Sequence, residues 1–314
     1  MKAPLILIPW YGPWPDYFPP FLDGCRRNPE FEVLFFSDTP PPEKHPASVS
    51  FVNISLERFA KLISSAAGTE VRVSRPYKLC DFKPVYGLAL KEWIGDREFW
   101  GFGDIDVIWG NLKKFASEKV LAGVDIFCVR KEYVSGAFTL IRNNAVMNAM
   151  FMRSPDWRRV FTEPNYFGFD ECATQWHELI FGARYDELNS PICSFSEVVF
   201  RALEHGEIRG YFETVALEDG HSRVDVSERG VFEYFVGYAL FHFVIVKRRA
   251  AFVYPKWSQV PLRYHLTRRG FLLANGDGVW KQLTSIRYFA IASKLSQKLK
   301  RLGRRSISRL LQKS

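Results

Sequence analysis

Two carboxylates stand one residue apart inside an apolar block of the sequence. Asp104 and Asp106 interrupt the run FWGFGDIDVIWGNL, which otherwise consists mainly of aromatic, aliphatic and glycine residues. Burying an unpaired charge is costly, and two neighbouring carboxylates repel unless a proton or a cation lies between them. Carboxylate oxygens are hard ligands that suit Mg²⁺ or Mn²⁺. The pair therefore indicates a divalent-metal site, with two solvated turn aspartates as the structural alternative.

The residues before this block alternate between strand and helix patterns. We expect strands at 4–8, 32–38 and 49–55, a helix beginning near FLDGCRRN, and a helix over 56–68 that ends at Gly68. The block at 99–110 is expected to be a fourth strand, with the carboxylates in its middle or at its end. This alternation is typical of an α/β fold with a mostly parallel sheet flanked by helices. Ligands bind such sheets at the carboxyl ends of the strands.

The later elements follow a less regular pattern. We expect helical segments within 77–95, 112–123 and 144–153, strands at 125–129 and 137–143, a loop leading into a helix over 166–182, and strands at 211–217 and 238–246.

The positive charge is concentrated at the end of the chain. Residues 281–314 contain ten Lys and Arg residues and no acidic residue. Because the whole chain carries +9 and this segment +10, the first 280 residues carry −1. Leucines at helical spacing among these cations predict a basic amphipathic helix. We therefore expect one domain over 1–280 and a tail over 281–314, and no nucleic-acid binding by the protein as a whole.

Targeting signals are not apparent in the sequence. The amino-terminal apolar run is short and lacks a cleavage site, and no apolar stretch is long enough to span a membrane. The five cysteines are scattered, without C-x-x-C spacing, which predicts reduced thiols. These features predict a cytoplasmic protein.

Several segments, taken in order, resemble one known group. They are LIPWYGPWPDYFPPFLDGCRRNPEFEVLFFSD, YKLCDFKPVYG, FWGFGDIDVIWGNL and VSGAFTLIRN, followed by a fainter similarity at LFHFVIVKRR. Together they resemble a family of bacterial glycosyltransferases of the GT-A type, which carry a D-x-D motif and use nucleotide-sugar donors. The resemblance covers about the first 180 residues and implies a GT-A-like (Rossmann-like) fold. It also implies a part in surface polysaccharide biosynthesis.

The resemblance implies roles for individual residues. Ile8, Tyr11 and Gly12 would border the nucleotide, Asp38 would lie near the base, and Lys78, Asp81 and Lys83 would lie near the nucleotide-sugar. Asp104, Ile105 and Asp106 would form the motif that holds the metal and the ribose–diphosphate, and His242 would be a third metal ligand. A histidine ligand favours Mn²⁺ over Mg²⁺. Asp170 and Glu171 are candidates for the catalytic base of an inverting reaction, or simply the acids of a helix start.

The resulting expectation is transfer of a sugar to a hydroxyl of a glycan or lipid-linked acceptor. A basic tail would suit attachment to an anionic membrane surface, at the inner face of the cell membrane. The alternatives are a nucleotidyltransferase with a carboxylate-bound metal and a non-catalytic scaffold at the membrane surface. A P-loop kinase is unsupported, because the sequence has no G-x-x-x-x-G-K-[ST] motif.

Overall fold

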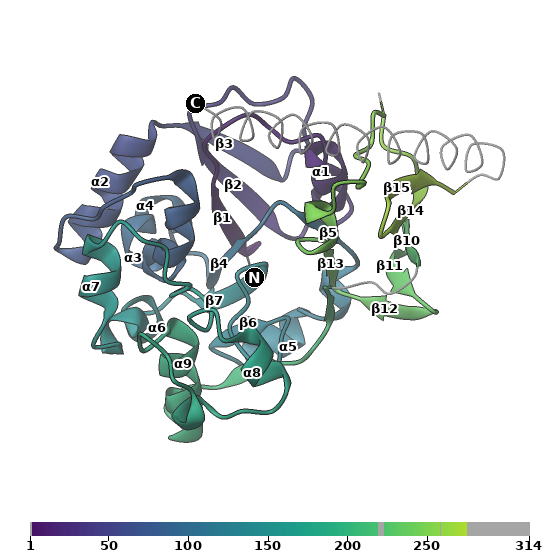
Figure 1. Cartoon of the computed structure of the whole chain (residues 1–314). Coiled ribbons are helices and arrows are strands. Elements are labelled where there is room, and N and C mark those ends of the chain that lie inside the picture. The colour runs from purple at the N-terminus through teal and green to yellow at the C-terminus, as the bar shows by residue number, and fades with distance from the viewer. Residues whose placement is uncertain (1, 219–222, 258, 275–314) are drawn as a thin grey trace, which may run out of the picture.

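A seven-stranded sheet forms the centre of the molecule (Figure 1). The computed structural model describes residues 2–218, 223–257 and 259–274. The strand order is β3-β2-β1-β4-β7-β6-β8. The strands are β1 (Leu5–Pro9), β2 (Glu32–Ser37), β3 (Val49–Asn53), β4 (Phe99–Gly103), β6 (Ile126–Cys128), β7 (Phe138–Arg142) and β8 (Gly210–Phe212). Only β7 runs antiparallel to its neighbours, β4 and β6, and this confirms the expected mostly parallel sheet.

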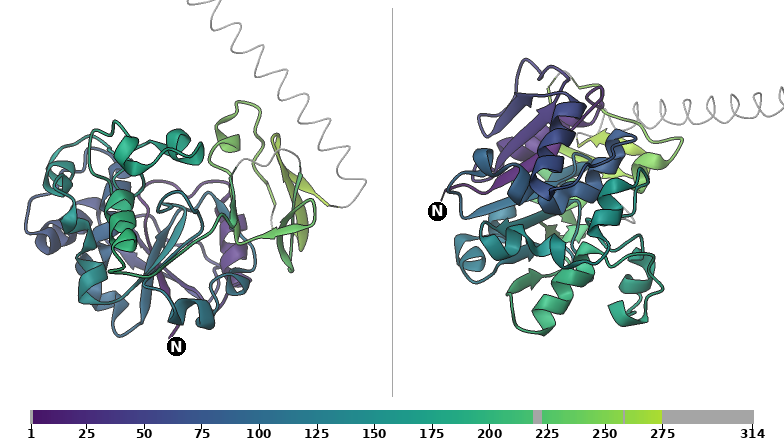
Figure 2. Two further views of the ribbon diagram at one scale, coloured as in Figure 1. Left: turned by 90° about the horizontal axis from the view of Figure 1, so that it is seen from below. Right: turned by 90° about the vertical axis from the view of Figure 1, so that its left-hand side faces the viewer.

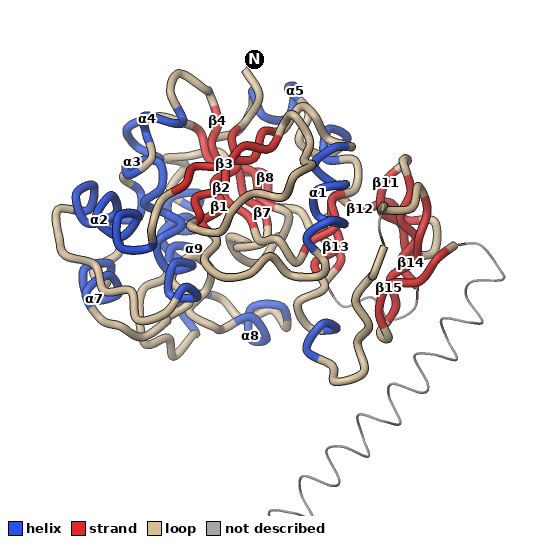
Figure 3. The backbone as a smooth tube through the Cα atoms, turned by 90° about the horizontal axis from the view of Figure 1, so that it is seen from above, coloured by secondary structure: helices blue, strands red, loops and turns tan. Residues whose placement is uncertain are grey.

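Both faces of this sheet are covered, which explains why its strands are apolar at successive positions. In β1, Ile6 faces one core cluster and Leu7 faces the other. Helix α1 (Phe18–Arg26) and helix α5 (Glu118–Ala122) contribute to the first cluster. The second cluster includes residues of α2 (Leu56–Ala67), α7 (Trp157–Thr162) and α9 (Phe195–Glu204). Figure 3 shows helices on both sides of the strands.

Helix α2 forms as the sequence predicts. The Ser55 hydroxyl accepts a hydrogen bond from the Arg58 N–H at the start of the helix, and Gly68 ends it with φ 64°. Three other predicted helices are broken into short pieces. Residues 77–95 form a 3₁₀ helix (Pro76–Val85), α3 (Tyr86–Ala89) and α4 (Lys91–Ile94). Residues 112–123 form a 3₁₀ turn (Leu112–Lys114) and α5, and residues 144–153 form α6 (Ala145–Asn148) and a 3₁₀ turn (Met150–Arg153).

The block containing the two aspartates is not one strand. It divides into β4, a loop at 104–106, and β5 (Val107–Trp109), so the single predicted strand is wrong. Strand β5 joins a three-stranded sheet with β13 (Leu240–His242) and β9 (Ala216–Leu217). Within the predicted strand at 238–246, β13 covers only residues 240–242. A 3₁₀ turn (Val246–Arg248) begins at the last residue of the predicted range.

A five-stranded antiparallel sheet was not expected from the sequence. Its order is β12-β11-β10-β14-β15. The strands are β10 (Arg223–Ser227), β11 (Gly230–Glu233), β12 (Val236–Tyr238), β14 (Arg263–Thr267) and β15 (Gly270–Leu273). Figure 2 shows these strands beside the main sheet. Residues such as Val224, Leu266 and Phe271 belong to the same core cluster as Phe18 and Trp109, so the two parts share one apolar interior.

The remaining predictions concern the tail, the membrane and the cysteines. The basic tail over 281–314 lies outside the described residues. Among the described residues, no helix is both long and apolar enough to cross a membrane. All five cysteines are free thiols, as expected. The boundary between the predicted domain and tail stays a prediction.

Candidate metal centre and its surroundings

Three predicted ligands meet at the junction of two sheets. Asp104 follows the carboxyl end of β4, and Asp106 directly precedes β5. Antiparallel pairing of β13 with β5 aligns His242 with Val107, next to Asp106. The His242 Nε2 atom lies 3.6 Å from Asp106 Oδ1 and 4.0 Å from Asp104 Oδ2. One ligand atom from each residue falls within 4.8 Å of the other two, which suits a single ion.

The imidazole of His242 is held from its other side. Its Nδ1 atom lies 3.3 Å from Glu218 Oε1. The other oxygen of Glu218 accepts a hydrogen bond from the Tyr133 hydroxyl at 3.3 Å and lies 3.4 Å from the Arg130 guanidinium. Metal-binding histidines generally donate their second ring N–H to a carboxylate or carbonyl oxygen. Glu218 therefore stands where a metal-binding histidine needs a hydrogen-bond acceptor.

The environment of the His242 Nε2 atom tests whether these residues fit a metal ion. It is buried and has no hydrogen-bond partner among the described residues, and it faces the two carboxylates. Buried polar atoms are normally hydrogen-bonded, so this nitrogen calls for a partner. Two carboxylates and one imidazole are a donor set that accepts Mn²⁺. The residues present therefore fit a divalent ion.

Without an ion, the buried carboxylate of Asp106 is neutralised by two cationic groups. Burial would raise its pKa, but His242 and Lys247 outweigh burial and hold the pKa well below its usual range. The Lys247 Nζ atom lies 2.6 Å from Asp106 Oδ2. Burial would lower the pKa of His242, but Asp106 and Glu218 raise it to about 10. A bound cation would replace the imidazole proton, because a metal ligand must be the neutral ring.

A second cluster adjoins Asp104 and is centred on Lys83. The Lys83 ammonium lies 2.8 Å from Asp104 Oδ1 and 3.4 Å from Asp170 Oδ2, and it donates to the Gly136 carbonyl at 3.0 Å. Burial alone would lower the pKa of Lys83, but the carboxylates Asp104 and Asp170 contribute to raising it well above its usual value. Lys83 therefore links the predicted metal ligand Asp104 to the predicted catalytic acid Asp170.

The two predicted catalytic acids differ in their hydrogen bonding. Glu171 accepts from the Gly136 N–H at 2.7 Å and from the Trp176 indole N–H at 2.8 Å, one bond to each oxygen. Asp170 is buried, and its Oδ1 atom has no hydrogen-bond partner among the described residues. Burial raises the pKa of both carboxyls, and nearby Lys83 opposes that rise. Asp170 is thus the acid with an available oxygen.

Gly136 allows this cluster to close. A Cβ atom at that position would meet Lys83 Nζ at 2.9 Å, Asp170 Oδ2 at 3.0 Å and Glu171 Oε1 at 3.1 Å. Any side chain at this position would push these polar groups apart.

Lys78 and Asp81 are placed differently from the prediction. Both side chains have no exposed surface, and they form an ion pair at 2.8 Å. Asp81 also accepts from the backbone N–H groups of Phe167 and Phe169, at 2.9 and 2.8 Å. Lys78 donates to the carbonyls of residues 160 and 165. The pair therefore fixes the segment that leads to Asp170, and neither side chain can reach a ligand in this conformation.

The predicted nucleotide-binding residues lie at the same edge of the sheet as Asp104. Tyr11 and Gly12 follow β1, and Asp38 follows the parallel strand β2 and is exposed. The Tyr11 hydroxyl is buried without a hydrogen-bond partner among the described residues, and burial together with Asp38 raises its pKa. The side chains of Ile8 and Ile105 are buried in the core, so only their backbone could contact a ligand.

The position of this edge in the sheet matters for ligand binding. The chain passes from β1 to β2 on one side, and β4 pairs with β1 on the other. Ligands of open α/β sheets bind outside the carboxyl ends of strands at such a switch in direction.

Sequence reasoning missed Glu218, because a lone glutamate outside any motif gives no indication of its partner.

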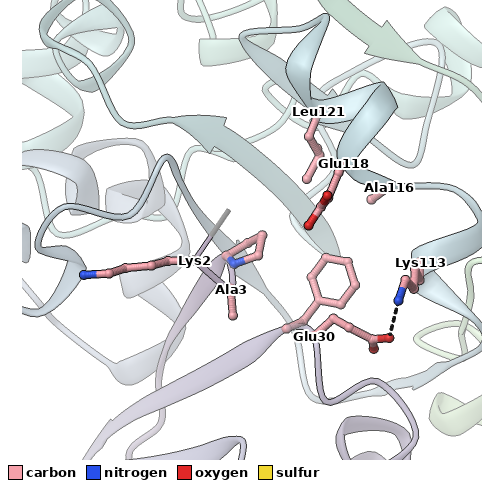
Figure 4. Close-up of a pocket in the computed structure, with 9 residues that line it drawn as sticks. Lys2, Ala3, Glu30, Lys113, Ala116, Glu118 and Leu121 are labelled. Carbon is pink, nitrogen blue, oxygen red and sulfur yellow. Dashed lines mark hydrogen bonds and ion pairs between the residues drawn. The ribbon is translucent and has the colours of Figure 1, made fainter.

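A separate cavity lies at the other end of the strands. It has a volume of about 210 Å³ and is lined by Pro4, before β1, and Phe31, before β2, so it lies at the amino ends of these strands. Figure 4 shows Lys113 and Glu30 paired at its rim. Drug-sized ligands usually occupy about 300–1,000 Å³. Its lining includes none of Asp104, Asp106 and His242, so this cavity is not the metal centre.

The fold and the site define an α/β protein with a candidate divalent-metal centre at the carboxyl edge of its main sheet. The chain belongs to DUF6625, a family of unknown function, which it matches over residues 6–237. No curated protein matches it in sequence.

Three solved structures that this chain resembles belong to two glycosyltransferases. Mouse xyloside xylosyltransferase 1, in its apo form, has a TM-score of 0.38 and 11% identity, covering 78% of this chain and 98% of that one. The galactosyltransferase LgtC, in complex with donor and acceptor sugar analogues, has a TM-score of 0.37 and 11% identity, covering 76% and 87%. An active-site mutant of LgtC has a TM-score of 0.34 and 13% identity, with the same coverage. At these TM-scores the likeness carries no argument about activity.

Proposed function

We propose that this protein transfers a sugar from a nucleotide-sugar donor to a hydroxyl of a glycan or lipid-linked acceptor, with the help of a divalent cation. The observation that carries the proposal is the environment of His242. Its buried Nε2 atom faces Asp104 and Asp106 and has no hydrogen-bond partner in the described part of the chain, while Glu218 contacts its Nδ1 atom. This arrangement stands at the sheet edge where α/β proteins bind nucleotides.

Asp104, Asp106 and His242 would hold the cation. The imidazole ligand favours Mn²⁺ over Mg²⁺, although both accept carboxylate oxygens. Such an ion would supply Lewis-acid neutralisation of the diphosphate leaving group.

The cationic side chains of this chain would share that task. Departure of a nucleoside diphosphate concentrates negative charge, which nearby ammonium groups stabilise. Lys247 already contacts Asp106 at the candidate metal centre, and its side chain is partly exposed. Lys83 is buried beside Asp104 and keeps that carboxylate in place.

Asp170 is the residue we assign to the acceptor hydroxyl. Its Oδ1 atom has no hydrogen-bond partner among the described residues, and burial raises the pKa of this carboxyl, which suits a group that accepts a proton. Glu171 is bound through both oxygens, so we assign it to positioning the turn at Gly136.

The location of the protein remains a proposal from the sequence. A cytoplasmic protein whose basic tail, residues 281–314, lies on the anionic inner face of the cell membrane would meet lipid-linked acceptors there. Such acceptors are the substrates of surface polysaccharide assembly.

The first experiment is thermal stabilisation by UDP-, GDP-, CMP- and dTDP-sugars, each with and without Mn²⁺. A ligand that binds only the folded protein raises the Tm. We expect a Mn²⁺-dependent rise for one nucleotide class, followed by sugar transfer to an added acceptor mixture.

Asp106→Asn should abolish the rise, whereas Asp186→Asn, at an exposed ion pair far along the chain, should leave it unchanged. Release of pyrophosphate from a nucleoside triphosphate and a sugar 1-phosphate, with no sugar transfer from any nucleotide-sugar, would indicate a nucleotidyltransferase. Stabilisation by no nucleotide with Mn²⁺ present would contradict the proposal.

A further inference from the structure

Two aromatic residues occupy an unusual turn at the end of the five-stranded sheet. Glu233 pairs with Val236, so Tyr234 and Phe235 form the two-residue turn between β11 and β12. Both have positive φ, 47° and 70°. Such turns strongly prefer Asn-Gly, because a β-carbon is unfavourable in the left-handed region. An aromatic pair there works against the stability of the turn.

The same two side chains are directed into solvent. Tyr234 is 72% exposed and Phe235 is fully exposed, and Val236 beside them is also exposed. Single exposed apolar residues are common in soluble proteins. A strained turn that exposes two adjacent aromatic rings is uncommon. This turn therefore points to a contact made outside the chain.

Arginines lie at the same end of this sheet. Strands β11 and β14 both run antiparallel to β10, so their closing turns lie at one edge. The β14–β15 turn is formed by Arg268 and Arg269, both exposed. Arg223 opens β10 at this edge. Figure 1 shows these strands as one group at the right of the molecule.

A further arginine joins this edge from the metal-centre side. The Val253 N–H donates to the Arg269 carbonyl, and the neighbouring Phe252 N–H donates to the backbone carbonyl of Arg249, whose side chain is exposed. Two acidic residues of these strands that the structure describes are engaged or buried. Asp225 pairs with Arg223 and His265, and Glu233 is buried. The exposed edge is therefore aromatic and basic. We name it the aromatic–arginine edge: Arg223, Tyr234, Phe235, Arg249, Arg268 and Arg269.

We propose that the aromatic–arginine edge docks on an anionic lipid bilayer. Aromatic rings settle at the level of lipid headgroups, and arginines around them bind anionic phosphates. The two turns supply both at one edge of the sheet. This docking surface is separate from the tail over 281–314 and does not depend on the proposed reaction. Docking would hold the candidate metal centre at a fixed distance from the bilayer surface. The reason is that Lys247, which contacts Asp106, is two residues from Arg249.

The test is flotation of the full chain with vesicles of equal parts phosphatidylcholine and phosphatidylglycerol, and with phosphatidylcholine alone. The informative variant is Tyr234→Asn with Phe235→Gly, which installs the pair that this turn prefers. We expect its Tm to stay unchanged or rise while vesicle affinity falls about tenfold or more. Arg268→Gln with Arg269→Gln should weaken binding to the anionic vesicles by a similar factor.

Two matched controls separate docking from general loss of surface groups. Phe181→Ser removes another highly exposed aromatic ring, and Arg58→Gln with Arg72→Gln removes two exposed arginines elsewhere. Both should leave vesicle binding unchanged.

A photo-crosslinking residue distinguishes this edge from binding through the tail. Benzoylphenylalanine placed at position 235 should form a lipid adduct, whereas the same residue at position 181 should not. Absence of a lipid adduct at 235 would overturn the proposal. So would unchanged vesicle affinity in the Tyr234→Asn, Phe235→Gly variant. Binding to DNA or heparin that matches vesicle binding and is indifferent to these aromatic residues would replace it with general polyanion binding.

Discussion

His242 lies between two carboxylate systems, with Nδ1 3.3 Å from Glu218 Oε1 and Nε2 3.6 Å from Asp106 Oδ1. The first contact orients the ring, and the second directs the free nitrogen to the candidate metal position. Since Glu218 also contacts Arg130 and Tyr133, the ring is held by a network that includes none of the predicted ligands.

Removing this support should weaken metal binding without removing a ligand. We expect Glu218→Gln to lower Mn²⁺ affinity about 10- to 100-fold, as loss of outer partners of a metal ligand typically does. Titration of Mn²⁺ by electron paramagnetic resonance measures it. Glu213→Gln, at an exposed position, is the control. Equal affinity in the two variants would show that Glu218 does not position His242.

Lys247 competes with a cation for Asp106 and should also help bind the leaving group. We therefore expect Lys247→Gln to raise the affinity for Mn²⁺ alone, because a positive charge 2.6 Å from Asp106 Oδ2 disappears. The same change should lower the affinity for a nucleoside diphosphate with Mn²⁺ present. Calorimetric titration of each ligand into the variant and the unmodified protein measures both changes in affinity. A fall in both affinities would mean that Lys247 only maintains the structure of the loop.

The pH dependence of sugar transfer should reflect the raised pKa of Asp170. A base must be deprotonated, so kcat/KM should rise with pH and level off above that pKa, which burial moves above the usual aspartate range. We expect Asp170→Asn to lower kcat about 100-fold or more and to remove this acid limb. Glu171→Gln should keep the limb. An unchanged profile in Asp170→Asn would assign the base elsewhere.

The ion pair between Lys78 and Asp81 should contribute to stability and not to metal binding. Asp81→Ala leaves a buried ammonium without its counter-charge, which typically costs about 3–5 kcal/mol. Urea denaturation measures this change in the free energy of unfolding. Asp96→Ala, at a surface ion pair with Lys2, should have no measurable effect. A small loss of stability with a large loss of nucleotide binding would restore the predicted ligand role of Asp81.

The first half of the fold could be predicted from local patterns. Strands β1, β2 and β3 are apolar runs bounded by turns, and α2 carries its own start and stop signals at Ser55 and Gly68. The segment 77–95 is harder to predict, because a 3₁₀ helix that contains Pro84 replaces the first part of the helical pattern, and the pattern breaks again at Leu90. The antiparallel sheet was missed because its strands have only three to five residues each.

The sequence by itself determined the chemistry available: two aspartates at the end of an apolar strand, a lysine nearby, and a basic tail. These follow from residue types and short spacings, which the chain fixes locally. Tertiary structure alone decided which distant groups complete the site. Pairing of β5 with β13 brings His242 to Asp106, and Glu218 arrives through the neighbouring strand β9. These contacts depend on strand register and packing between separate elements, and no local pattern encodes them.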